Sequence, residues 1–185
     1  MTETPPLPAD ALALLDFWWT AGPAAWFSAD PEFDDACRRF RELQKRAATG
    51  ELDGWAVTAP GALALLLLLD QLPRNLYRDT AGAFATDPKA LAIAETALAR
   101  GFDRAYPMPA KGFFYLPFMH AEDLSAQERS LDLYRVTGDQ TTYFYALVHY
   151  DAVRRFGRFP HRNRVLGRTT SEAERAYLDT GGFSG

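Results

Sequence analysis

The stretch TAPGALALLLLLDQLPRN, residues 58–75, gives the strongest indication of the fold. Its apolar run over residues 61–69 is about half of the roughly 20 residues that a membrane span needs, so it is typical of a helix buried in a protein core. Thr58 can cap the start of this helix. Asp70 and Gln71 stand at its C-terminal end, where the helix dipole disfavours a carboxylate without a cationic partner. The stretch therefore predicts a buried helix that ends in a polar site.

Helix signals continue along the chain, whereas alternating β-branched runs are absent and valine and isoleucine are scarce. We expect one all-α domain over residues 1–185, with about seven helices stacked as antiparallel pairs. Residues 1–8 are expected to be flexible, residues 101–117 to form an ordered loop with a short helical turn at GFFYLP, and Ser125 and Glu128 to form a capping box. The expected helices cover residues 9–19, 30–50, 58–69, 87–100, 125–137, 139–156 and 171–179.

Composition excludes several classes of protein. The chain is 48% apolar and carries a formal net charge of −4 without a long run of Lys or Arg, so we expect a globular protein with no nucleic-acid partner. Cys37 is the only cysteine, which rules out an intrachain disulfide and favours a small core residue over a nucleophile. The N-terminus lacks the pattern of a secretory signal, and no run is long enough to cross a membrane. We expect a cytoplasmic protein that does not bind a membrane.

Two similar turns carry polar residues. DQLPRN at residues 70–75 and FGRFPHRN at residues 156–163 both place Arg-Asn after a proline, at the end of an apolar segment. In the first turn, Asp70, Arg74 and Asn75 fit a buried network of ion pairs and turn caps, and they equally fit a ligand site. Both interpretations remain open from the sequence.

The second turn lies in HYDAVRRFGRFPHRNRVLGRTT, residues 149–170, which concentrates Arg, His and Asn side chains. Asp151 and Arg155 are spaced to pair on one helix face, which leaves the arginines after Gly157 without a local carboxylate. Such a loop suits a bound carboxylate or phosphate, because guanidinium groups donate hydrogen bonds in a bidentate fork. The alternative is an internal network in which these arginines pair with four acidic residues: Asp70, Glu122, Asp123 and Glu128.

A third polar stretch is FYLPFMHAEDLSAQERS, residues 114–130, in which His120, Glu122 and Asp123 precede a capped helix. A histidine and carboxylate metal site is conceivable here. However, the chain contains no HExxH, no CxxC and no phosphate-cradling GxxxxGK sequence. We therefore expect neither a metal nor a cofactor.

These strings, in this order, closely resemble the bacterial family called domain of unknown function 924. The resemblance spans nearly the whole chain and is carried by DQLPRN, MHAEDLSAQE and RFGRFPHRN. It implies an all-helical fold grouped with tetratricopeptide-like helical arrays, and it implies no established activity. The family more often has phenylalanine before the proline of DQLPRN, and leucine keeps that position apolar.

We expect the three stretches to converge on one pocket with apolar walls from Trp18, Trp55, Phe113, Tyr115 and Phe159. The first functional hypothesis is an enzyme or binding protein for a small anionic ligand, a phosphate or a carboxylate. The alternative is a non-catalytic helical scaffold that binds a peptide or protein partner through an aromatic groove. The expected catalytic residues are His120, Glu122 and His161. The expected ligand-binding residues are Asp70, Gln71, Arg74, Asn75, His149, Arg162 and Asn163.

Convergence of the stretches makes a geometric prediction. Asp70 or Glu122 should lie within hydrogen-bonding distance of an arginine from residues 154–168. The reaction, the ligand and the oligomeric state are left open by the sequence.

Overall fold

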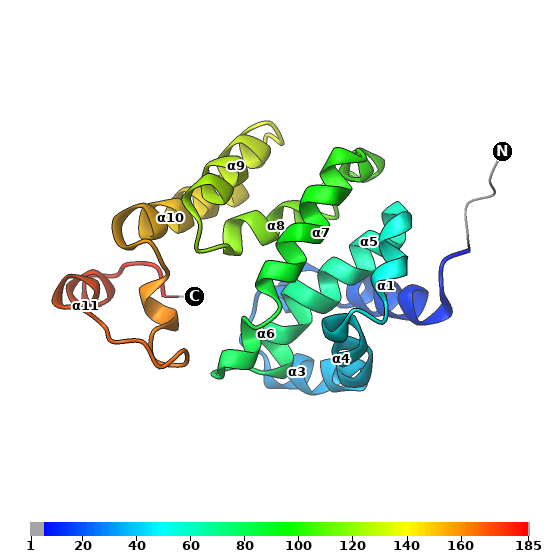
Figure 1. Ribbon diagram of the computed structural model, residues 1–185, viewed down its shortest axis with the longest axis horizontal. Helices are drawn as coiled ribbons and strands as arrows, with labels where there is room; N and C mark the ends of the chain where they lie inside the picture. Colours follow the sequence, from blue (N-terminus) through cyan, green and yellow to red (C-terminus); the bar gives the residue numbers. More distant parts are fainter. Residues whose placement is uncertain (1–5, 185) are drawn as a thin grey trace. The chain divides into compact units, whose positions relative to one another are not determined.

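The computed structural model describes residues 6–184, and these residues contain helices and loops but no strand (Figure 1). The expected all-α class is confirmed. Residues 1–5, which belong to the segment expected to be flexible, lie outside the described residues. The expected count of about seven helices is not confirmed, because short turns divide the long helices and the described helices run from α1 to α11.

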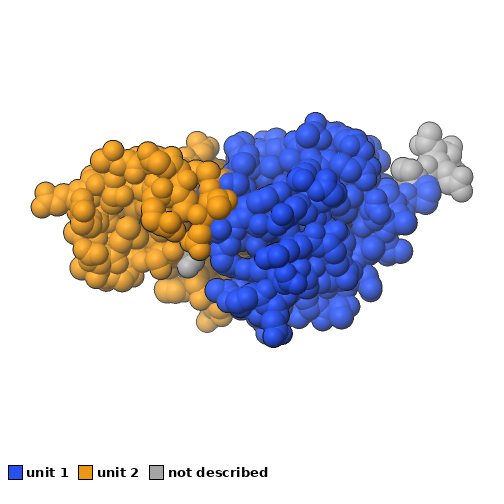
Figure 2. Space-filling model, turned by 90° about the horizontal axis from the view of Figure 1, so that it is seen from below, with its two compact units in different colours: residues 1–78, 82–114 blue, residues 79–81, 115–185 orange. Residues whose placement is uncertain are grey.

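The chain divides into two compact units (Figure 2). Unit 1 comprises residues 1–78 and 82–114, and unit 2 comprises residues 79–81 and 115–185. The single domain expected over residues 1–185 stays a prediction.

The core of unit 1 is built around the stretch 58–75. It forms α5 (Ala59–Leu66), a π-helical segment (Leu67–Gln71) and α6 (Leu72–Leu76). Residues 61–73 are all buried, as the unbroken apolar run predicts. Four other helices contact this central element: α1 (Ala9–Ala21), α3 (Pro31–Cys37), α4 (Arg41–Thr49) and α7 (Asp87–Ala99).

The π-helical segment has a local cause in Pro73. Proline has no backbone N–H, so the carbonyl of Leu69, four residues earlier, loses its helical donor. The hydroxyl of Thr86 donates to this carbonyl at 2.5 Å and replaces the missing bond. The segment places Asp70 and Gln71 inside the unit, 1% and 5% exposed, and π-helical turns of this kind often accompany functional residues.

Several expected helix ends are confirmed in unit 1. The side chain of Thr58 accepts a hydrogen bond from the N–H of Gly61, and that of Asp30 accepts one from Glu32. Gly50 ends α4 with a left-handed φ of 92°. The helix expected over residues 30–50 is interrupted by a 3-10 turn at Arg38–Phe40. The short helix α2 (Pro23–Trp26) is not among the expected helices.

Aromatic side chains fill the other side of the unit 1 core. Trp18 stacks on Trp26 with ring centroids 5.9 Å apart, and Phe113 contacts Trp26 edge-on at 5.1 Å. Cys37, at the end of α3, is fully buried, and this burial raises the pKa of its thiol to about 12. The interpretation of Cys37 as a core residue is therefore confirmed.

Unit 2 contains the end of α8 (Gly112–His120), followed by α9 (Leu124–Arg135), α10 (Gln140–Phe156) and α11 (Glu172–Asp179). Helices α9 and α10 lie side by side and run in opposite directions. The FGRFPHRN turn follows α10 and contains one 3-10 turn at Pro160–Arg162.

The helical turn expected at GFFYLP is present, and it is longer than expected: it forms the nine-residue helix α8, whose residues Phe113 to Met119 are all buried. One expectation for this part of the chain is wrong. The capping box at Ser125 is not formed. Asp123 caps α9 instead, accepting a 2.8 Å hydrogen bond from the N–H of Ala126, and the hydroxyl of Ser125 donates to the same carboxylate.

Within residues 6–184, no helix is both long enough and apolar enough to cross a membrane.

Candidate functional site

The predicted site residues fall in both units. Unit 1 holds Asp70, Gln71, Arg74 and Asn75. Unit 2 holds His120, Glu122, His149, His161, Arg162 and Asn163. The predicted apolar walls divide in the same way, with Trp18, Trp55 and Phe113 in unit 1 and Tyr115 and Phe159 in unit 2.

In unit 1, Arg74 connects the central helix to the start of α7. Its guanidinium donates to both carboxylate oxygens of Asp87, at 3.0 and 3.1 Å, and to the backbone carbonyl of Asp70. The carboxylate of Asp70 accepts a hydrogen bond from the amide of Gln71 and lies 3.6 Å from Arg74. The charge of Arg74 is thus met by carboxylates within its own unit.

Asn75 makes a second connection, to α3. Its amide donates to Asp34 at 2.9 Å, and the same carboxylate receives two hydrogen bonds of 2.7 Å from Arg78. Burial would raise the pKa of Asp34, but the hydrogen bonds from Arg78 and Asn75 hold it below its usual value. The polar groups of DQLPRN therefore tie α6 to α3 and α7.

In unit 2, all three histidines of the chain gather near the rings of Phe159 and Phe183. The ring of His149 contacts the rings of His120 and Phe183, with centroids 6.0 and 4.0 Å away. His161 contacts Phe159 at 5.7 Å and Phe183 at 5.0 Å. We call His120, His149, His161, Phe159 and Phe183 the histidine cluster.

Arg162 borders the histidine cluster. Its guanidinium carbon lies 4.4 Å from the centroid of the Phe159 ring, a cation–π arrangement, and the residue is only 5% exposed. A buried cation thus lies at the edge of the histidine cluster, against the ring of Phe159.

Glu122 holds the turn in place. Arg168 donates to both of its carboxylate oxygens, at 2.5 and 2.9 Å, and the N–H of Phe159 donates to it at 2.8 Å. This contact confirms that Glu122 lies within hydrogen-bonding distance of an arginine from residues 154–168. Burial would raise the pKa of Glu122, but the hydrogen bonds from Arg168 and Phe159 keep it below its usual value. Glu122 is therefore ionised, and it holds the loop through Arg168 and the backbone of Phe159.

Two further clamps fix the backbone of the motif. Asn163 is fully buried, accepts a 2.9 Å hydrogen bond from Arg168 and donates to the hydroxyl of Thr170 at 3.4 Å. Asn163 is therefore a positioning residue for the loop.

Arg158 makes the second clamp. It donates to both oxygens of Glu174, at 2.6 and 2.9 Å, and this pairing is the main reason why the pKa of Glu174 falls to about 2.

Gln127 positions the other wall of the histidine cluster. It is fully buried on α9, and its amide nitrogen donates to the carbonyls of Met119 at 2.6 Å and Ala121 at 2.8 Å. These carbonyls flank His120 at the end of α8, so Gln127 fixes the backbone that carries His120 and Glu122.

Two histidines are neutral at pH 7. Burial lowers the pKa of His149 to about 3, and the nearby His120 and Arg162 act in the same direction. Burial also lowers the pKa of His161 to about 4, with the charge of Arg162 as the next cause, and Glu122 opposes this effect. At His161, the repulsion by Arg162 is larger than the attraction by Glu122. The surroundings of His161 therefore disfavour a further positive charge.

The neutral imidazoles present hydrogen-bond acceptors. Nδ1 of His149 lies 2.8 Å from the carbonyl of Tyr145, so Nδ1 carries the proton and Nε2 is the acceptor. Nδ1 of His161 is buried and has no hydrogen-bond partner within residues 6–184. The cluster can thus supply two imidazole acceptors next to the guanidinium of Arg162, an arrangement that suits an anion carrying a hydroxyl or acid proton.

Three residues of this site are not among the predicted site residues: Gln127, Arg168 and Phe183. Gln127 and Arg168 lie in the polar stretches that drew attention in the sequence, but their spacing carries no sign of their partners. Phe183 follows Gly181 and Gly182 near the chain end and forms part of no pattern.

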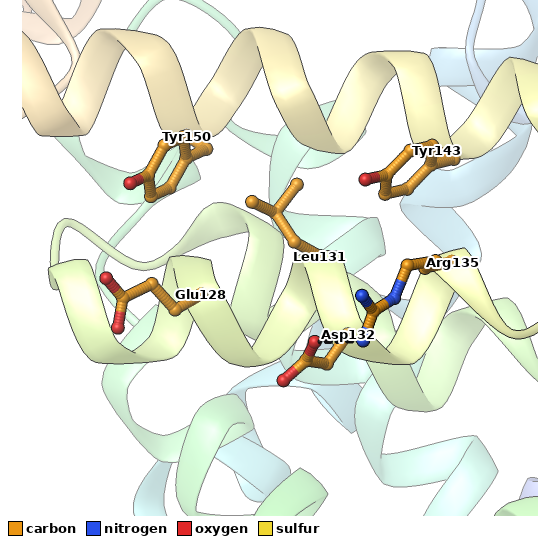
Figure 3. Close-up of a pocket in the computed structure, with 6 residues that line it drawn as sticks. All are labelled: Glu128, Leu131, Asp132, Arg135, Tyr143 and Tyr150. Carbon is orange, nitrogen blue, oxygen red and sulfur yellow. Dashed lines mark hydrogen bonds and ion pairs between the residues drawn. The ribbon is translucent and has the colours of Figure 1, made fainter.

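Unit 2 also has two surface grooves. One, of about 410 Å³, lies between α9 and α10, where Tyr143 and Tyr150 point towards α9 on either side of Leu131 (Figure 3). Its remaining lining residues are Glu128, Asp132 and Arg135. The other groove, of about 420 Å³, lies between α10 and the segment after α11. Phe183 belongs both to this second groove and to the histidine cluster.

Within residues 6–184, no three His, Cys, Asp or Glu side chains lie close enough together to hold a metal ion.

Compared with curated proteins, the chain has no match. A solved structure titled as a protein of unknown function, ATU0120 from Agrobacterium tumefaciens, is similar to it with 49% sequence identity and a TM-score of 0.89. The match covers 92% of this chain and 97% of the Agrobacterium chain. The model of a family described as bacterial protein of unknown function, DUF924, matches residues 14–182, and the chain belongs to this family.

Proposed function

We propose that the protein binds a small anionic ligand, a phosphate or a carboxylate, at the histidine cluster of unit 2. The observation that carries the proposal is that His120, His149 and His161 gather beside the buried Arg162, where burial and cationic neighbours keep His149 and His161 neutral. Burial is the main reason why His161 stays neutral, and the charge of Arg162, which adds to this effect, attracts an anion.

Each residue has a role in this proposal. Arg162 donates to the anion, since a guanidinium matches the geometry of carboxylate and phosphate oxygens. Nε2 of His149 and Nδ1 of His161 accept hydrogen bonds from a ligand hydroxyl or from a monoprotonated phosphate. Glu122 and Asn163 hold the loop through Arg168. If the protein is an enzyme, His161 is the general base, because an imidazole that is neutral at pH 7 can accept a proton.

The proposal extends to three finer expectations from the sequence. Asp70, Gln71, Arg74 and Asn75 are proposed as further ligand-binding residues. The helix pairs are proposed to stack in a tetratricopeptide-like arrangement, and the protein is proposed to act in the cytoplasm. Anion binding at Arg162 does not require any of these three expectations to hold.

The test is thermal unfolding of the protein with a panel of phosphates and carboxylates. At about 100 times its dissociation constant, a ligand that binds only the native state raises the free energy of unfolding by roughly 2.7 kcal/mol. We expect such an increase for at least one anion. Arg162→Gln should lose most of it, and Arg162→Lys should keep part of it, because lysine keeps the charge but loses the planar fork.

Arg164→Gln is the matched control. Arg164 lies two residues away on the same loop, and its ion pair with Asp79 is 74% and 75% exposed. This variant should respond to the anions as wild type does. Equal responses of wild type, Arg162→Gln and Arg164→Gln, or no response to any anion, would contradict the proposal.

A second candidate function is the scaffold alternative, and the groove in Figure 3 favours it. Tyr143 and Tyr150 lie one helical heptad apart on α10, and neither hydroxyl has a hydrogen-bond partner within residues 6–184. Partly exposed tyrosines with free hydroxyls are typical contact residues for peptides. The test is binding of a labelled peptide library to wild type and to Tyr150→Ser: loss of binding in the variant supports the scaffold, and equal binding excludes this groove.

A further inference from the structure

The groove between α10 and the segment after α11 is mainly apolar. Its lining includes Phe144, Leu147 and Val148 from α10, together with Tyr177 and Phe183. Its volume of about 420 Å³ lies within the range of roughly 300–1,000 Å³ that small-molecule sites occupy. The groove is therefore large enough for a small ligand.

The apolar lining is unusually open to solvent. Phe144 is 60% exposed and Leu147 is 40% exposed, although both lie in the middle of a long helix. Single exposed apolar residues are common, but apolar residues that gather along one groove mark a binding surface. The ion pair of Asp151 and Arg155, four residues apart, also lines the groove and gives it a polar rim.

Phe183 joins this groove to the histidine cluster. Its ring lines the groove and also contacts the rings of His149, at 4.0 Å, and His161, at 5.0 Å. The backbone N–H of Phe183 donates to the hydroxyl of Tyr177 at 3.0 Å, which ties the backbone of Phe183 to α11. The apolar groove and the imidazoles are thus separated by the thickness of one aromatic ring.

We propose that this groove holds the apolar body of the ligand whose anionic head binds at the histidine cluster, so that the ligand class is an amphipathic anion with an alkyl or acyl chain. The proposal rests on the proposed function, because it needs the head-group site. Phe183 is the wall that the head and the chain share. Phe144, Leu147 and Val148 cover the chain, and the Asp151–Arg155 pair is the charged part of the same lining.

The experiment is a titration of the full chain with straight-chain alkyl phosphates, from methyl to octyl, each below its critical micelle concentration, with inorganic phosphate as the head-group reference. Each methylene buried in the groove should tighten binding about fourfold, until the groove is full. In Leu147→Ser this gain with chain length should shrink, whereas the affinity for inorganic phosphate should stay that of wild type.

Leu124→Ser is the matched control, since Leu124 is a leucine of the same unit, 43% exposed, and does not line the groove. It should leave the gain with chain length unchanged. Arg162→Gln should weaken every member of the series by a similar factor, because it removes a contact with the shared head group.

The outcomes separate this inference from the proposed function. Binding of inorganic phosphate without any gain from longer chains overturns the inference and leaves the proposed function in place. A gain with chain length that Leu147→Ser and Leu124→Ser change equally overturns the inference as well. If long chains bind equally to wild type and Arg162→Gln while inorganic phosphate does not bind, both proposals are overturned.

Discussion

The two Pro-Arg-Asn turns of the chain have nearly the same sequence but different surroundings. In unit 1, the guanidinium of Arg74 forms a bidentate pair with Asp87, and the amide of Asn75 donates to Asp34. In unit 2, the guanidinium of Arg162 lies over the ring of Phe159, and Asn163 pairs with Arg168. The first turn connects helices through carboxylates, and the second places an arginine among neutral imidazoles.

This difference shows how one local motif can lie in two different electrostatic surroundings. Proline sets the backbone of both turns and delivers Arg and Asn at fixed positions. What surrounds the arginine then decides its chemistry. Arg74 is paired with carboxylates and makes a structural clamp, whereas Arg162 lies over a phenyl ring and its charge helps to lower the pKa values of His149 and His161.

The largest effect is expected for Arg74→Gln. The Arg74–Asp87 pair is largely buried, with side chains 23% and 10% exposed, so the variant leaves a buried carboxylate without its bidentate donor. We expect the free energy of unfolding to fall by about 3 kcal/mol. Urea denaturation measures this loss.

Arg38→Gln is the control for this experiment. Its ion pair with Asp35 is 66% and 71% exposed, so its loss should change the stability by less than about 0.5 kcal/mol. If Arg74→Gln is as harmless as Arg38→Gln, the first turn is no clamp, and the contrast between the turns is lost.

A smaller effect is expected for Glu122→Gln. The amide oxygen can still accept the N–H of Phe159, but the charge that receives Arg168 is lost. The two side chains are 24% and 23% exposed, and we expect a loss of about 2 kcal/mol. An unchanged urea midpoint would show that Glu122 does not hold the motif loop.

The histidine cluster predicts acid sensitivity. The pKa values of His149 and His161 are about 3 and about 4 in the folded protein, below the ordinary 6.5 of an unfolded chain. Above pH 6.5 both rings are neutral in both states, so they add no pH dependence. Below pH 6.5 the unfolded state binds protons that the folded state does not yet bind. Each histidine should therefore lower the free energy of unfolding by about 1.4 kcal/mol per pH unit, down to about pH 4.

Urea denaturation at pH 7.0, 6.0 and 5.0 checks this slope. The matched variant is His161→Gln, which should show a shallower slope than wild type over the same range. A stability that stays constant between pH 7.0 and 5.0 would mean that the histidines are solvated, and the contrast with the carboxylate-rich first turn would disappear.

The smallest effect is expected for Arg164→Gln. Its pair with Asp79 is almost fully solvated, so the stability should stay within about 0.5 kcal/mol of wild type. A larger loss would mean that the FGRFPHRN turn depends on its outer charges as well as on the clamps of Glu122 and Glu174.

Much of the helical pattern could be predicted from the sequence, because caps and apolar runs are local signals. Asp30, Thr58 and Asp139 cap helices as their residue types suggest. The helical turn predicted at residues 112–117 is the start of the longer helix α8, and its length has a non-local reason. The aromatic residues of α8 are buried, and no local rule weighs that burial against Gly112 and Pro117.

The composition of the candidate site could also be predicted, but its pairing could not. The polar stretches do contain His120, His149, His161 and Arg162, which unit 2 brings together. Which acid each arginine meets depends on packing: Arg168 reaches Glu122, 46 residues earlier in the chain. Phe183 could not be predicted as a site residue, because a single aromatic residue after two glycines matches no motif.

The most direct test of anion binding at the histidine cluster is a nuclear magnetic resonance titration of the imidazole signals with phosphate at pH 7. The chain has only three histidines, so their signals can be assigned by single substitutions. We predict that the signals of His149 and His161 shift and saturate as phosphate is added, and that the shifts are absent in Arg162→Gln. Imidazole signals that do not move, or that move equally in wild type and Arg162→Gln, would contradict anion binding at this cluster.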